Sequence, residues 1–501
     1  MISRPYLSDY KLISYYTGRI ILGVAMLMLV PLVTAVLCRE ATPFFDFLLS
    51  LGLTATIGIL FLILGEKKKE VRWLHAMVIG AFSWLIAMLL AAIPHYLSGH
   101  FLSYLDACFD VMSGFTTTGL VLIQDIDHLA DSMNMWRHLL TYVGGQGMIV
   151  LVLTFLMRGT AGAYMMYVGE GKDEKLLPNV VQTTRAIWII SIIYMFIGTA
   201  LIGLTAYKEG MVDIPRAFLH GLWLFMTTWS TGGFAPQSQN IVYYHSLAIE
   251  TVTLIFMVLG SMNFILHYSI WSGNRKEIFK NIEIVSFVCT VTATLSLLTF
   301  ALIKSGIYAG LFTIFRRGLY ILISGHTGTG CANIYAQQFV KDWGPLAMLA
   351  VTTAMAIGGS ACSTCGGFKG LRVGLFFKGL FHEIKRIMLP ENAVFQTKFH
   401  HIKDILVTDS TIKMVGLILL CFILLYVGGG LLGAFYGYPF VDALFDSVSA
   451  GSTTGLSCGV TAAAMPTGLK IYFIFAMWAG RLEFLSIFGL TAFVISIFKG
   501  K

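Results

Sequence analysis

The sequence predicts an all-α, polytopic membrane protein in which four helix–pore-loop–helix repeats surround a pseudo-fourfold pore, preceded by two extra transmembrane helices. Two observations predict this fold class: an apolar composition, and a short Thr/Gly-ended segment that recurs four times between hydrophobic spans. The 501 residues are 57% hydrophobic and 12% charged, whereas soluble domains carry about 25% charged residues. Since a helical span needs about 20 apolar residues, the length allows around ten crossings.

Ten hydrophobic segments are candidate spans, at about 20–37, 45–65, 74–95, 136–157, 186–207, 246–271, 284–304, 344–358, 411–433 and 470–497. The basic residues gather in every second connection, around 67–72, 158–185, 275–280 and 369–413. Because cytoplasmic loops carry the excess of Lys and Arg, these connections and both termini are predicted to face the cytoplasm. The same bias, rather than nucleic-acid binding, accounts for the net charge of +8.

The connections on the other side each contain a half-apolar stretch that is too short to cross, at about 103–118, 215–231, 312–329 and 439–454. Their ends resemble one another: SGFTTTGL (113–120), SGHTGTGC (324–331), SAGSTTGL (449–456) and, most divergent, MTTWSTGG (226–233). Non-helical backbone at membrane depth must be buried in protein or face water. The pattern therefore predicts four re-entrant helices that each lead to a polar turn, rather than four unrelated Gly/Thr loops.

Four such turns in one chain can surround a single axis. Glycine permits positive φ, so successive carbonyls can point inward, and rings of carbonyls can replace the hydration shell of an alkali cation. The negative C-terminal ends of the re-entrant helices would also favour a cation. The predicted cation-binding residues are Thr117, Thr118, Gly119, Thr231, Gly232, Thr329, Gly330, Thr454 and Gly455.

The repeats divide the chain into five regions. An N-terminal two-helix extension is expected at 1–70, followed by pore repeats at 71–160, 161–275, 276–390 and 391–501. The inner helix of the third repeat is interrupted by a Gly-, Ser- and Cys-rich run at 357–368, which cannot hold a stable helix in lipid. The run is too long for a mere kink, and its backbone must line protein or water. It is the candidate gate, with the residues Gly358, Gly359, Ser360, Gly366 and Gly367.

Arg481 lies within an apolar segment, where a charge is by default a functional hypothesis. It belongs to the gate or to a structural ion pair, although Glu483 is two residues away and therefore on another helix face. Cys362 and Cys365 form the one CxxC sequence, and no further metal ligands lie near them in sequence. They are expected to act as small residues, although a thiol pair in a gate could be oxidised.

Other polar residues leave two interpretations open. Gln146 and Asn263 line a cavity or make interhelical hydrogen bonds, and His326 packs behind the third turn or makes it sensitive to pH. Four carboxylates attract cations to the outer mouth or cap the re-entrant helices. These are Asp106, Asp110, Asp442 and Asp446.

Five segments carry a resemblance to a known family: WRHLLTYVGGQGMIVL (136–151), TTWSTGGFAP (227–236), FMVLGSMNFILHY (256–268), IGGSACSTCGGFKGLRVGLFFK (357–378) and AGRLEFLSIFGL (479–490). Over roughly residues 15–497 the chain resembles the Trk/Ktr/HKT superfamily of potassium transporters, and most closely its bacterial TrkH/TrkG type. The two extra helices before the first repeat favour this type over KtrB, which resembles the four repeats alone.

The resemblance implies potassium uptake across the bacterial inner membrane through a selectivity filter, with K+ as the transported ion and no organic cofactor. It implies a homodimer with a pore in each subunit and a cytoplasmic TrkA-like nucleotide-binding partner that regulates transport. Glycine in all four turns resembles the potassium-preferring pattern, whereas serine in the first turn is associated with sodium preference. The resemblance also implies that the run at 357–368 obstructs the pore below the filter, and that Arg481 projects into the pore.

Other function classes fit the sequence less well. An enzyme would need clustered catalytic groups at membrane depth, and the spans contain few ionisable residues and no HExxH or Walker sequence. A carrier with alternating access would show inverted repeats, whereas these four repeats share one orientation. A sodium- or proton-coupled cation carrier with weaker potassium selectivity is the alternative to a potassium pore.

Overall fold

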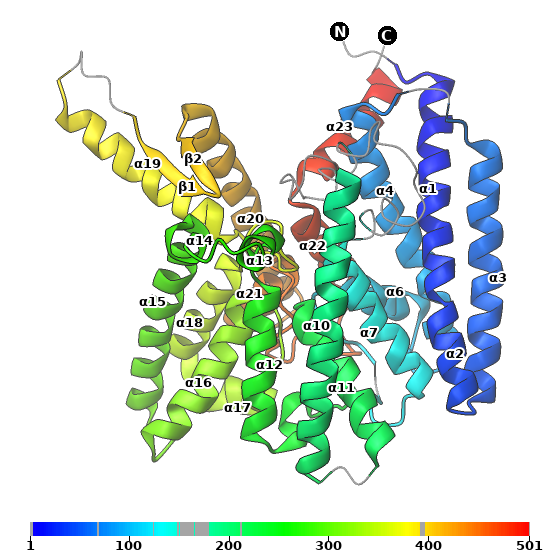
Figure 1. Cartoon of the computed structure of the whole chain (residues 1–501), viewed down its shortest axis with the longest axis horizontal. Helices are drawn as coiled ribbons and strands as arrows, with labels where there is room; N and C mark the ends of the chain where they lie inside the picture. The colour runs from blue at the N-terminus through cyan, green and yellow to red at the C-terminus, as the bar shows by residue number, and fades with distance from the viewer. Residues whose placement is uncertain are drawn as a thin grey trace.

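The computed structural model describes residues 4–67, 70–123, 125–147, 150, 165, 180–210, 213–390 and 396–499. Most of the basic connection predicted at 158–185, including the boundary between the first two repeats, lies outside these residues. The described chain is mostly helical, and the predicted fold class is confirmed (Figure 1).

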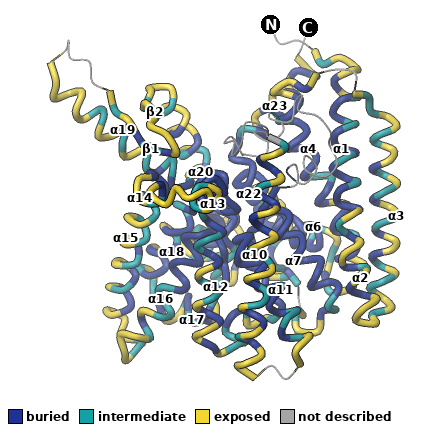
Figure 2. Tube along the Cα trace, in the orientation of Figure 1, coloured by how far each residue is buried: buried dark blue, intermediate teal, exposed yellow. Residues whose placement is uncertain are grey.

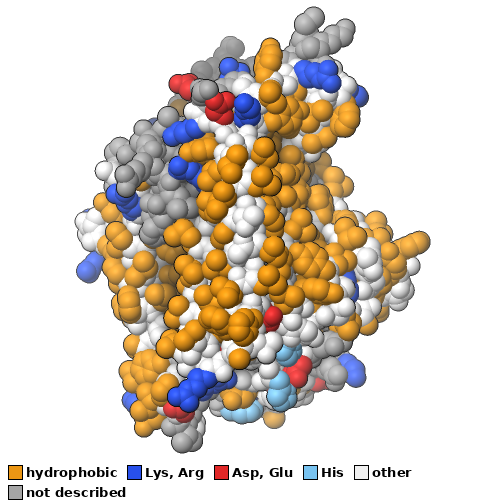
Figure 3. All heavy atoms as spheres, turned by 90° about the vertical axis from the view of Figure 1, so that its right-hand side faces the viewer, with side chains coloured by type: hydrophobic (Ala, Val, Ile, Leu, Met, Phe, Trp, Pro, Cys, Tyr) orange, Lys and Arg blue, Asp and Glu red, His pale blue; other side chains and the backbone are white. Residues whose placement is uncertain are grey.

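An N-terminal extension precedes the repeats. It consists of α1 (Leu7–Leu27), α2 (Leu29–Leu37) and α3 (Ala41–Leu64), and α1 packs along both α3 and α4. Large apolar side chains of α3, such as Phe45, Leu49 and Ile63, are exposed. Figure 3 shows this face covered by hydrophobic side chains, with basic groups gathered toward the two ends. An exposed apolar face of this size is typical of contact with lipid.

Each repeat contains an outer helix, a re-entrant helix and an inner helix. In the first repeat these are α4 (Trp73–Ala91), which continues into α5 (Ile93–Leu97), then α6 (Tyr104–Phe115) and α7 (Asp131–Gln146). The second contains α10 (Val180–Lys208), α11 (Ile214–Trp229) and, after the 3-10 helix η1 (Asn240–Tyr244), α12 (Leu247–Gly260) and α13 (Phe264–Trp271). The third contains α14 (Glu277–Lys280), α15 (Ile282–Ser305), α16 (Leu311–His326), α17 (Ala336–Lys341) and α18 (Gly344–Ile357). The fourth follows α19 (Gly370–Met388) and contains α20 (Asp409–Phe435), α21 (Phe440–Gly451), α22 (Thr467–Leu482) and α23 (Leu485–Lys499).

The re-entrant helices α6, α11, α16 and α21 have 12, 16, 16 and 12 residues. At 1.5 Å per residue they reach about 18–24 Å, less than the roughly 30 Å of a hydrocarbon core. Ser103 begins α6, because its side chain accepts a hydrogen bond from the Asp106 N–H at 3.2 Å. The polar turns at the helix ends are buried in the centre of the protein (Figure 2), as non-helical backbone at this depth requires.

Two of the candidate spans contain sharp bends. The segments at 246–271 and 470–497 each consist of two helices, which meet at 99° between α12 and α13 and at 110° between α22 and α23. Asn263 starts α13 by accepting the Ile265 N–H, while Glu483 and Phe484 take positive φ after α22. The helix α7 ends before Gly147, whose φ is 102°, and α18 ends at Ile357. Within the described residues, six helices are long and apolar enough to cross a membrane, or up to eight if each bent pair is one span.

One face of the protein carries both termini, α19 and a small β-hairpin (Figure 1). The strands β1 (Lys398–His401) and β2 (Lys403–Leu406) pair antiparallel, with Lys398 opposite Leu406. This hairpin precedes α20 and adds two short strands, which the sequence pattern did not predict, to an otherwise helical fold.

Candidate functional site

The four turns that follow the re-entrant helices share one backbone conformation, and they are called the pore turns here. Each begins with a residue at positive φ: Thr117 (58°), Thr231 (52°), Gly328 (67°) and Thr453 (54°). Two residues later each has a glycine at positive φ: Gly119 (88°), Gly233 (69°), Gly330 (83°) and Gly455 (94°). The residue between them donates its N–H back to the re-entrant helix, for example from Thr118 to the Ser113 carbonyl at 2.7 Å.

The second pore turn has a different register from the one that the sequence repeat predicts. Gly232 donates its N–H to the Thr227 carbonyl at 2.7 Å and so corresponds to Thr118. The glycine equivalent to Gly119 is therefore Gly233, and this corrects the predicted pairing of Thr231-Gly232 with Thr118-Gly119. The sequence alignment matched Thr-Gly pairs, whereas backbone conformation decides which residues are equivalent.

The pore turns close a ring, because each glycine lies against a carbonyl of the next repeat. A Cβ atom added at Gly119 would lie 2.6 Å from the Gly232 oxygen, and one at Gly233 would lie 2.4 Å from the Thr329 oxygen. In the same way, a Cβ atom added at Gly330 would lie 2.0 Å from the Thr454 oxygen, and one at Gly455 would lie 2.1 Å from the Thr118 oxygen. The contacts run from repeat one to two, three, four and back to one, so only glycine fits at these positions without displacing a carbonyl.

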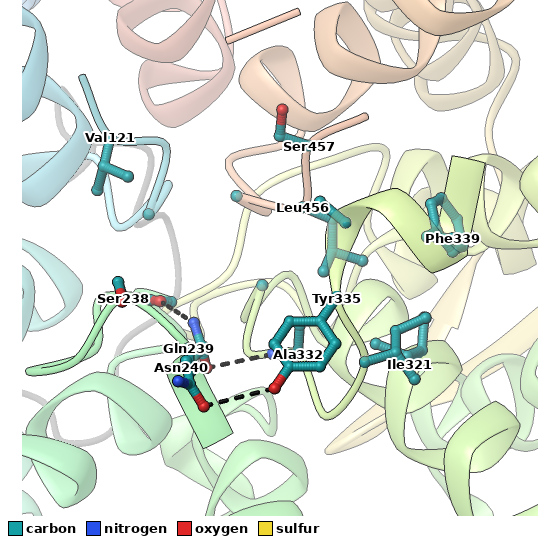
Figure 4. Close-up of a pocket in the computed structure, with 16 residues that line it drawn as sticks. Val121, Ser238, Gln239, Asn240, Ile321, Ala332, Tyr335, Phe339, Leu456 and Ser457 are labelled. Carbon is teal, nitrogen blue, oxygen red and sulfur yellow. Dashed lines mark hydrogen bonds between the residues drawn. The ribbon is translucent and has the colours of Figure 1, made fainter. Parts of the chain in front are cut away.

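A cavity of about 240 Å³ opens beside the four glycines. Asn240, Tyr335 and Ser457 line it together with apolar side chains (Figure 4). Asn240 fixes its wall, because its Oδ1 accepts the Ala332 N–H at 3.3 Å and its Nδ2 donates to the Gly233 carbonyl at 3.5 Å. Among the described residues that line the cavity none is charged, so its polarity comes from carbonyls, amides and hydroxyls.

The carboxylates expected at the outer mouth lie mainly behind the pore turns. Asp106 is buried and pairs with Lys470 at 2.6 Å. Asp110 is buried and pairs with Arg137 at 3.1 Å, and the Arg137 guanidinium stacks on the Phe234 ring directly after Gly233. These two ion pairs brace the turns from outside the ring.

Asp446 anchors the chain that leaves the fourth pore turn. Its buried carboxylate accepts hydrogen bonds from the Cys458 and Thr461 N–H groups and from the Ser457 and Thr461 hydroxyls, at 2.7–2.8 Å. Asp442, one helical turn earlier, is half-buried. Asp446 was predicted either to attract cations at the outer mouth or to cap a re-entrant helix. In the structure it instead holds the segment that contains Ser457, which lines the cavity.

Replacing Asp446 with Ala is expected to destabilise the protein, because these donors lose their acceptor. We expect a loss of about 3 kcal/mol, typical of several buried donors left without a partner, measured as a lower midpoint of thermal unfolding in detergent. The matched control Asp442→Ala should change stability by less than about 0.5 kcal/mol. An equal fall in both variants would contradict the anchoring role.

The residues 358–369 cross beneath the ring, and they are called the crossing segment here. Its central residue is Thr364: the Thr117 hydroxyl donates to the Thr364 carbonyl at 3.1 Å, and Thr231 Oγ1 lies 3.0 Å from Thr364 Oγ1. The same segment reaches the other two repeats, because Cys365 lies against Gly328 and Gly366 against Thr453. The crossing segment therefore contacts all four pore turns at the end opposite the cavity.

The predicted residues Gly358, Gly359, Ser360, Gly366 and Gly367 all lie in this segment. Gly358 (φ 72°) and Gly367 (φ 85°) form its narrow base. A Cβ added at Gly358 would lie 3.4 Å from the Gly367 Cα. The Ser360 N–H donates to the Ser261 carbonyl at 3.0 Å, at the break between α12 and α13.

Arg481 clamps the crossing segment to the first repeat. Its guanidinium donates to the Thr364 carbonyl and to the Gly144 and Gly145 carbonyls, the last two at 2.6 and 3.0 Å. Glu483 pairs instead with Lys369 and Arg372, where the segment joins α19. As expected from their spacing, Arg481 and Glu483 serve different partners.

Several of these contacts were not among the predicted site residues. Thr364 and Lys369 are buried residues of the crossing segment, and the buried Glu283 accepts the Ala361 N–H of this segment. The signal that could have indicated Lys369 and Glu283 is a charge bordering an apolar stretch. His326 packs behind the third pore turn, with Nε2 2.8 Å from Thr290 Oγ1. The Cys365 sulfur lies 2.9 Å from the Ser363 hydroxyl. In the described chain no group of three His, Cys, Asp or Glu side chains is arranged to hold a metal ion.

Comparisons with known proteins point to one family. Residues 50–316 and 335–497 match the family model of TrkH, a cation transport protein. An uncharacterized cation transporter of Methanocaldococcus jannaschii is 33% identical over 484 residues, which cover 97% of this chain and 96% of that protein. The Trk system potassium uptake protein TrkG of Escherichia coli is 28% identical over 492 residues, 95% of this chain and 96% of TrkG. The crystal structure of the potassium transporter TrkH from Vibrio parahaemolyticus superimposes with a TM-score of 0.79 at 22% identity, covering 95% of this chain and 97% of that chain.

Proposed function

The chain belongs to the TrkH family of cation transport proteins, and from this premise we propose that it carries potassium across the membrane through the ring of pore turns. The single observation that carries the proposal is the cyclic contact of four glycines with four carbonyls at the centre of the protein. Such carbonyls can take the place of the water around a dehydrated alkali cation. The C-terminal ends of four re-entrant helices meet at the same point and favour positive charge.

The proposed potassium-binding residues follow the structural register. They are the predicted residues, with Gly233 added as the equivalent of Gly119, and Gly328 and Thr453 added as the equivalents of Thr117. Potassium is the proposed ion because the named relatives TrkG and TrkH are potassium uptake proteins and transporters. The glycine in every pore turn fits this selectivity.

The face that carries both termini, α19 and the β-hairpin is proposed to be cytoplasmic, in the inner, or plasma, membrane. Basic residues of α19 and of the hairpin, such as Lys378, Lys385 and Lys398, support this orientation. We propose that the chain acts as a homodimer and that a TrkA-like nucleotide-binding protein docks on this face. The relatives are named as parts of a Trk system, which supports the existence of further components.

The crossing segment is proposed to be the gate. It contacts all four pore turns on the cytoplasmic side, and Thr364 lies where an ion would leave the ring. Arg481 places a positive charge beside the same carbonyl, which lowers cation occupancy while the segment is in place. Opening then requires that Thr364 and Arg481 move away from the axis.

The test is ion flux in liposomes that contain the purified protein, with reversal potentials measured under potassium, sodium and pH gradients. A reversal potential set by the potassium gradient is the expected result. A potential that follows the sodium or proton gradient would favour the coupled carrier instead. No cation flux, even with a nucleotide-binding partner present, would overturn the proposal.

A further inference from the structure

The β-hairpin is docked on the start of the third repeat by buried polar contacts. Glu277 in α14 accepts the Ile402 N–H at 3.0 Å, and its second oxygen lies 3.1 Å from His400 Nε2. Asn281 Nδ2 donates to Glu277 at 3.2 Å. Glu277 and Asn281 are 5% and 2% exposed, so these contacts form a defined joint rather than a surface encounter.

The same joint continues into the protein toward the crossing segment. Asn281 caps α15, because its Oδ1 accepts the Glu283 N–H at 3.0 Å, and it lies 3.2 Å from His401 Nδ1. Glu283 is 2% exposed and accepts the Ala361 N–H at 2.5 Å and the Asn263 Nδ2 at 3.4 Å. Ala361 is three residues before Thr364 in the chain. An unbroken series of contacts therefore joins the hairpin to the residue beneath the ring.

Two carboxylates hold the crossing segment, one near each end. Glu283 binds its first half through Ala361, and Glu483 binds its last residue, Lys369, and also pairs with Arg372 at the start of α19. A carboxylate buried in a low-dielectric interior needs its hydrogen-bond donors, so a movement of Glu283 away from Ala361 is costly for both groups. The position of α15 at Asn281 thus determines whether the first half of the segment stays in place.

We propose that the hairpin Lys398–Leu406 is a lever on the gate: when it is docked on Glu277 and Asn281, Glu283 holds Ala361 and keeps Thr364 beneath the ring. Undocking of the hairpin shifts Asn281 and Glu283 and releases the first half of the crossing segment. Glu283 is then a positioning residue for transport, since it acts on the pore through Ala361. This inference rests on the proposed gate.

The charges around His400 make the docking depend on pH. Hydrogen bonds to Asp404, on the same hairpin, and then to Glu277 in α14 raise the pKa of His400. Lys398 and Lys280 also lie near this group and lower the pKa of Asp404, after the larger effect of His400 itself, and Glu283 of α15 faces the adjacent His401. Asp404 stays beside His400 when the hairpin undocks, so the part of the pKa shift that depends on docking is the part due to Glu277. Because Glu277 raises the pKa of His400 further in the docked state, the contribution of this contact to docking is full below the pKa of the undocked hairpin and is lost as pH rises through the docked value. Cytoplasmic alkalinisation is therefore expected to undock the hairpin and loosen the gate.

The experiment uses the native Cys365, which is 1% exposed beneath the ring, as a reporter of gate movement. The purified full-length protein in detergent is labelled with a water-soluble maleimide, and modification of Cys365 is measured by peptide mass spectrometry relative to Cys38, which is exposed at the end of α2. His400→Ala and Glu283→Gln should each raise the relative labelling rate about tenfold, as for loss of a hydrogen bond to a charged group. Lys403→Ala, at the exposed hairpin turn, is the matched control and should leave the rate unchanged.

The double variant separates a lever from two unrelated defects. If the hairpin acts through Glu283, adding His400→Ala to Glu283→Gln should change labelling by less than about twofold, whereas independent effects would multiply. In the protein without substitutions, the relative labelling of Cys365 should be higher at pH 8 than at pH 6. This measurement does not depend on whether a variant folds.

Glu483→Gln distinguishes a failure of the lever from a failure of the gate. It should raise both Cys365 labelling and potassium flux, because it releases the second half of the segment. If Glu483→Gln changes neither quantity, the proposed gate fails. If it changes both while His400→Ala, Glu283→Gln and pH have no effect, the gate stands and the lever is overturned.

Discussion

A protein from which residues 359–366 are deleted is expected to conduct potassium without regulation. The deletion is feasible, because Gly358 and Gly367 approach each other at the base of the crossing segment, and the N–H groups of Phe368 and Lys369 bond to the Ala356 and Ile357 carbonyls at 2.9 and 2.8 Å. These contacts lie outside the deleted residues and keep α18 joined to α19. The pore below the ring then loses the one described segment that contacts all four pore turns.

The expected increase in potassium flux is about a hundredfold, since several hydrogen bonds of roughly 1 kcal/mol each hold the closed segment. The measurement is potassium flux into liposomes in the absence of any partner protein. Arg481→Gln keeps the segment but removes one clamp, and it should give an intermediate flux. A folded deletion variant that stays tightly closed would show that the crossing segment is not the gate.

Gly119→Ser is expected to raise the permeability to sodium relative to potassium. The added Cβ would lie 2.6 Å from the Gly232 carbonyl oxygen and 2.9 Å from the Gly233 Cα, so the ring must distort where an ion loses its water. Distortion changes the number and spacing of the carbonyls around the ion, and these determine the preference for potassium. The measurement is the reversal potential under bi-ionic potassium and sodium conditions.

Gly459→Ser is the matched control for this substitution. Gly459 also has a positive φ, 94°, but an added Cβ meets nothing within 4 Å. A serine at position 459 would therefore carry a similar backbone strain without touching the ring, and the ratio of sodium to potassium permeability should not change. Gly233→Ser should act like Gly119→Ser, which tests the corrected register of the second pore turn. An unchanged ratio in Gly119→Ser would show that Gly119 is not part of the proposed selectivity filter.

Much of the architecture could be predicted from local patterns. The hydrophobic spans, the short re-entrant stretches and their polar ends all follow from composition over windows of ten to twenty residues. The glycine requirement at three pore turns was also visible, because positive φ is a local demand that few other residues meet. The second pore turn was misaligned by one residue, because Gly232 and Gly233 are chemically identical in sequence and differ only in their neighbours in space.

The breaks in the inner helices were harder to predict. The segments around Asn263 and Glu483 are apolar on both sides, so hydropathy predicts one continuous span. In the structure Asn263 caps α13, and its side-chain amide donates to Glu283. Glu483 forms ion pairs with the basic side chains of Lys369 and Arg372. A helix breaks at these positions because partners elsewhere in the chain satisfy the backbone and the charge, and such partners leave no trace in the local sequence.

The sequence by itself determined that this is a membrane protein of four repeats, with a glycine-containing turn at the end of each re-entrant helix and a Gly-, Ser- and Cys-rich interruption near residue 362. These properties depend on hydropathy and backbone freedom, which each segment carries alone. Only the tertiary structure decided which glycine meets which carbonyl, that Thr364 lies beneath the ring, and that Glu283 holds Ala361. The physical reason is that these contacts join residues far apart in the chain, as with Thr117 and Thr364 or Gly144 and Arg481, and their geometry exists only when the four repeats pack together.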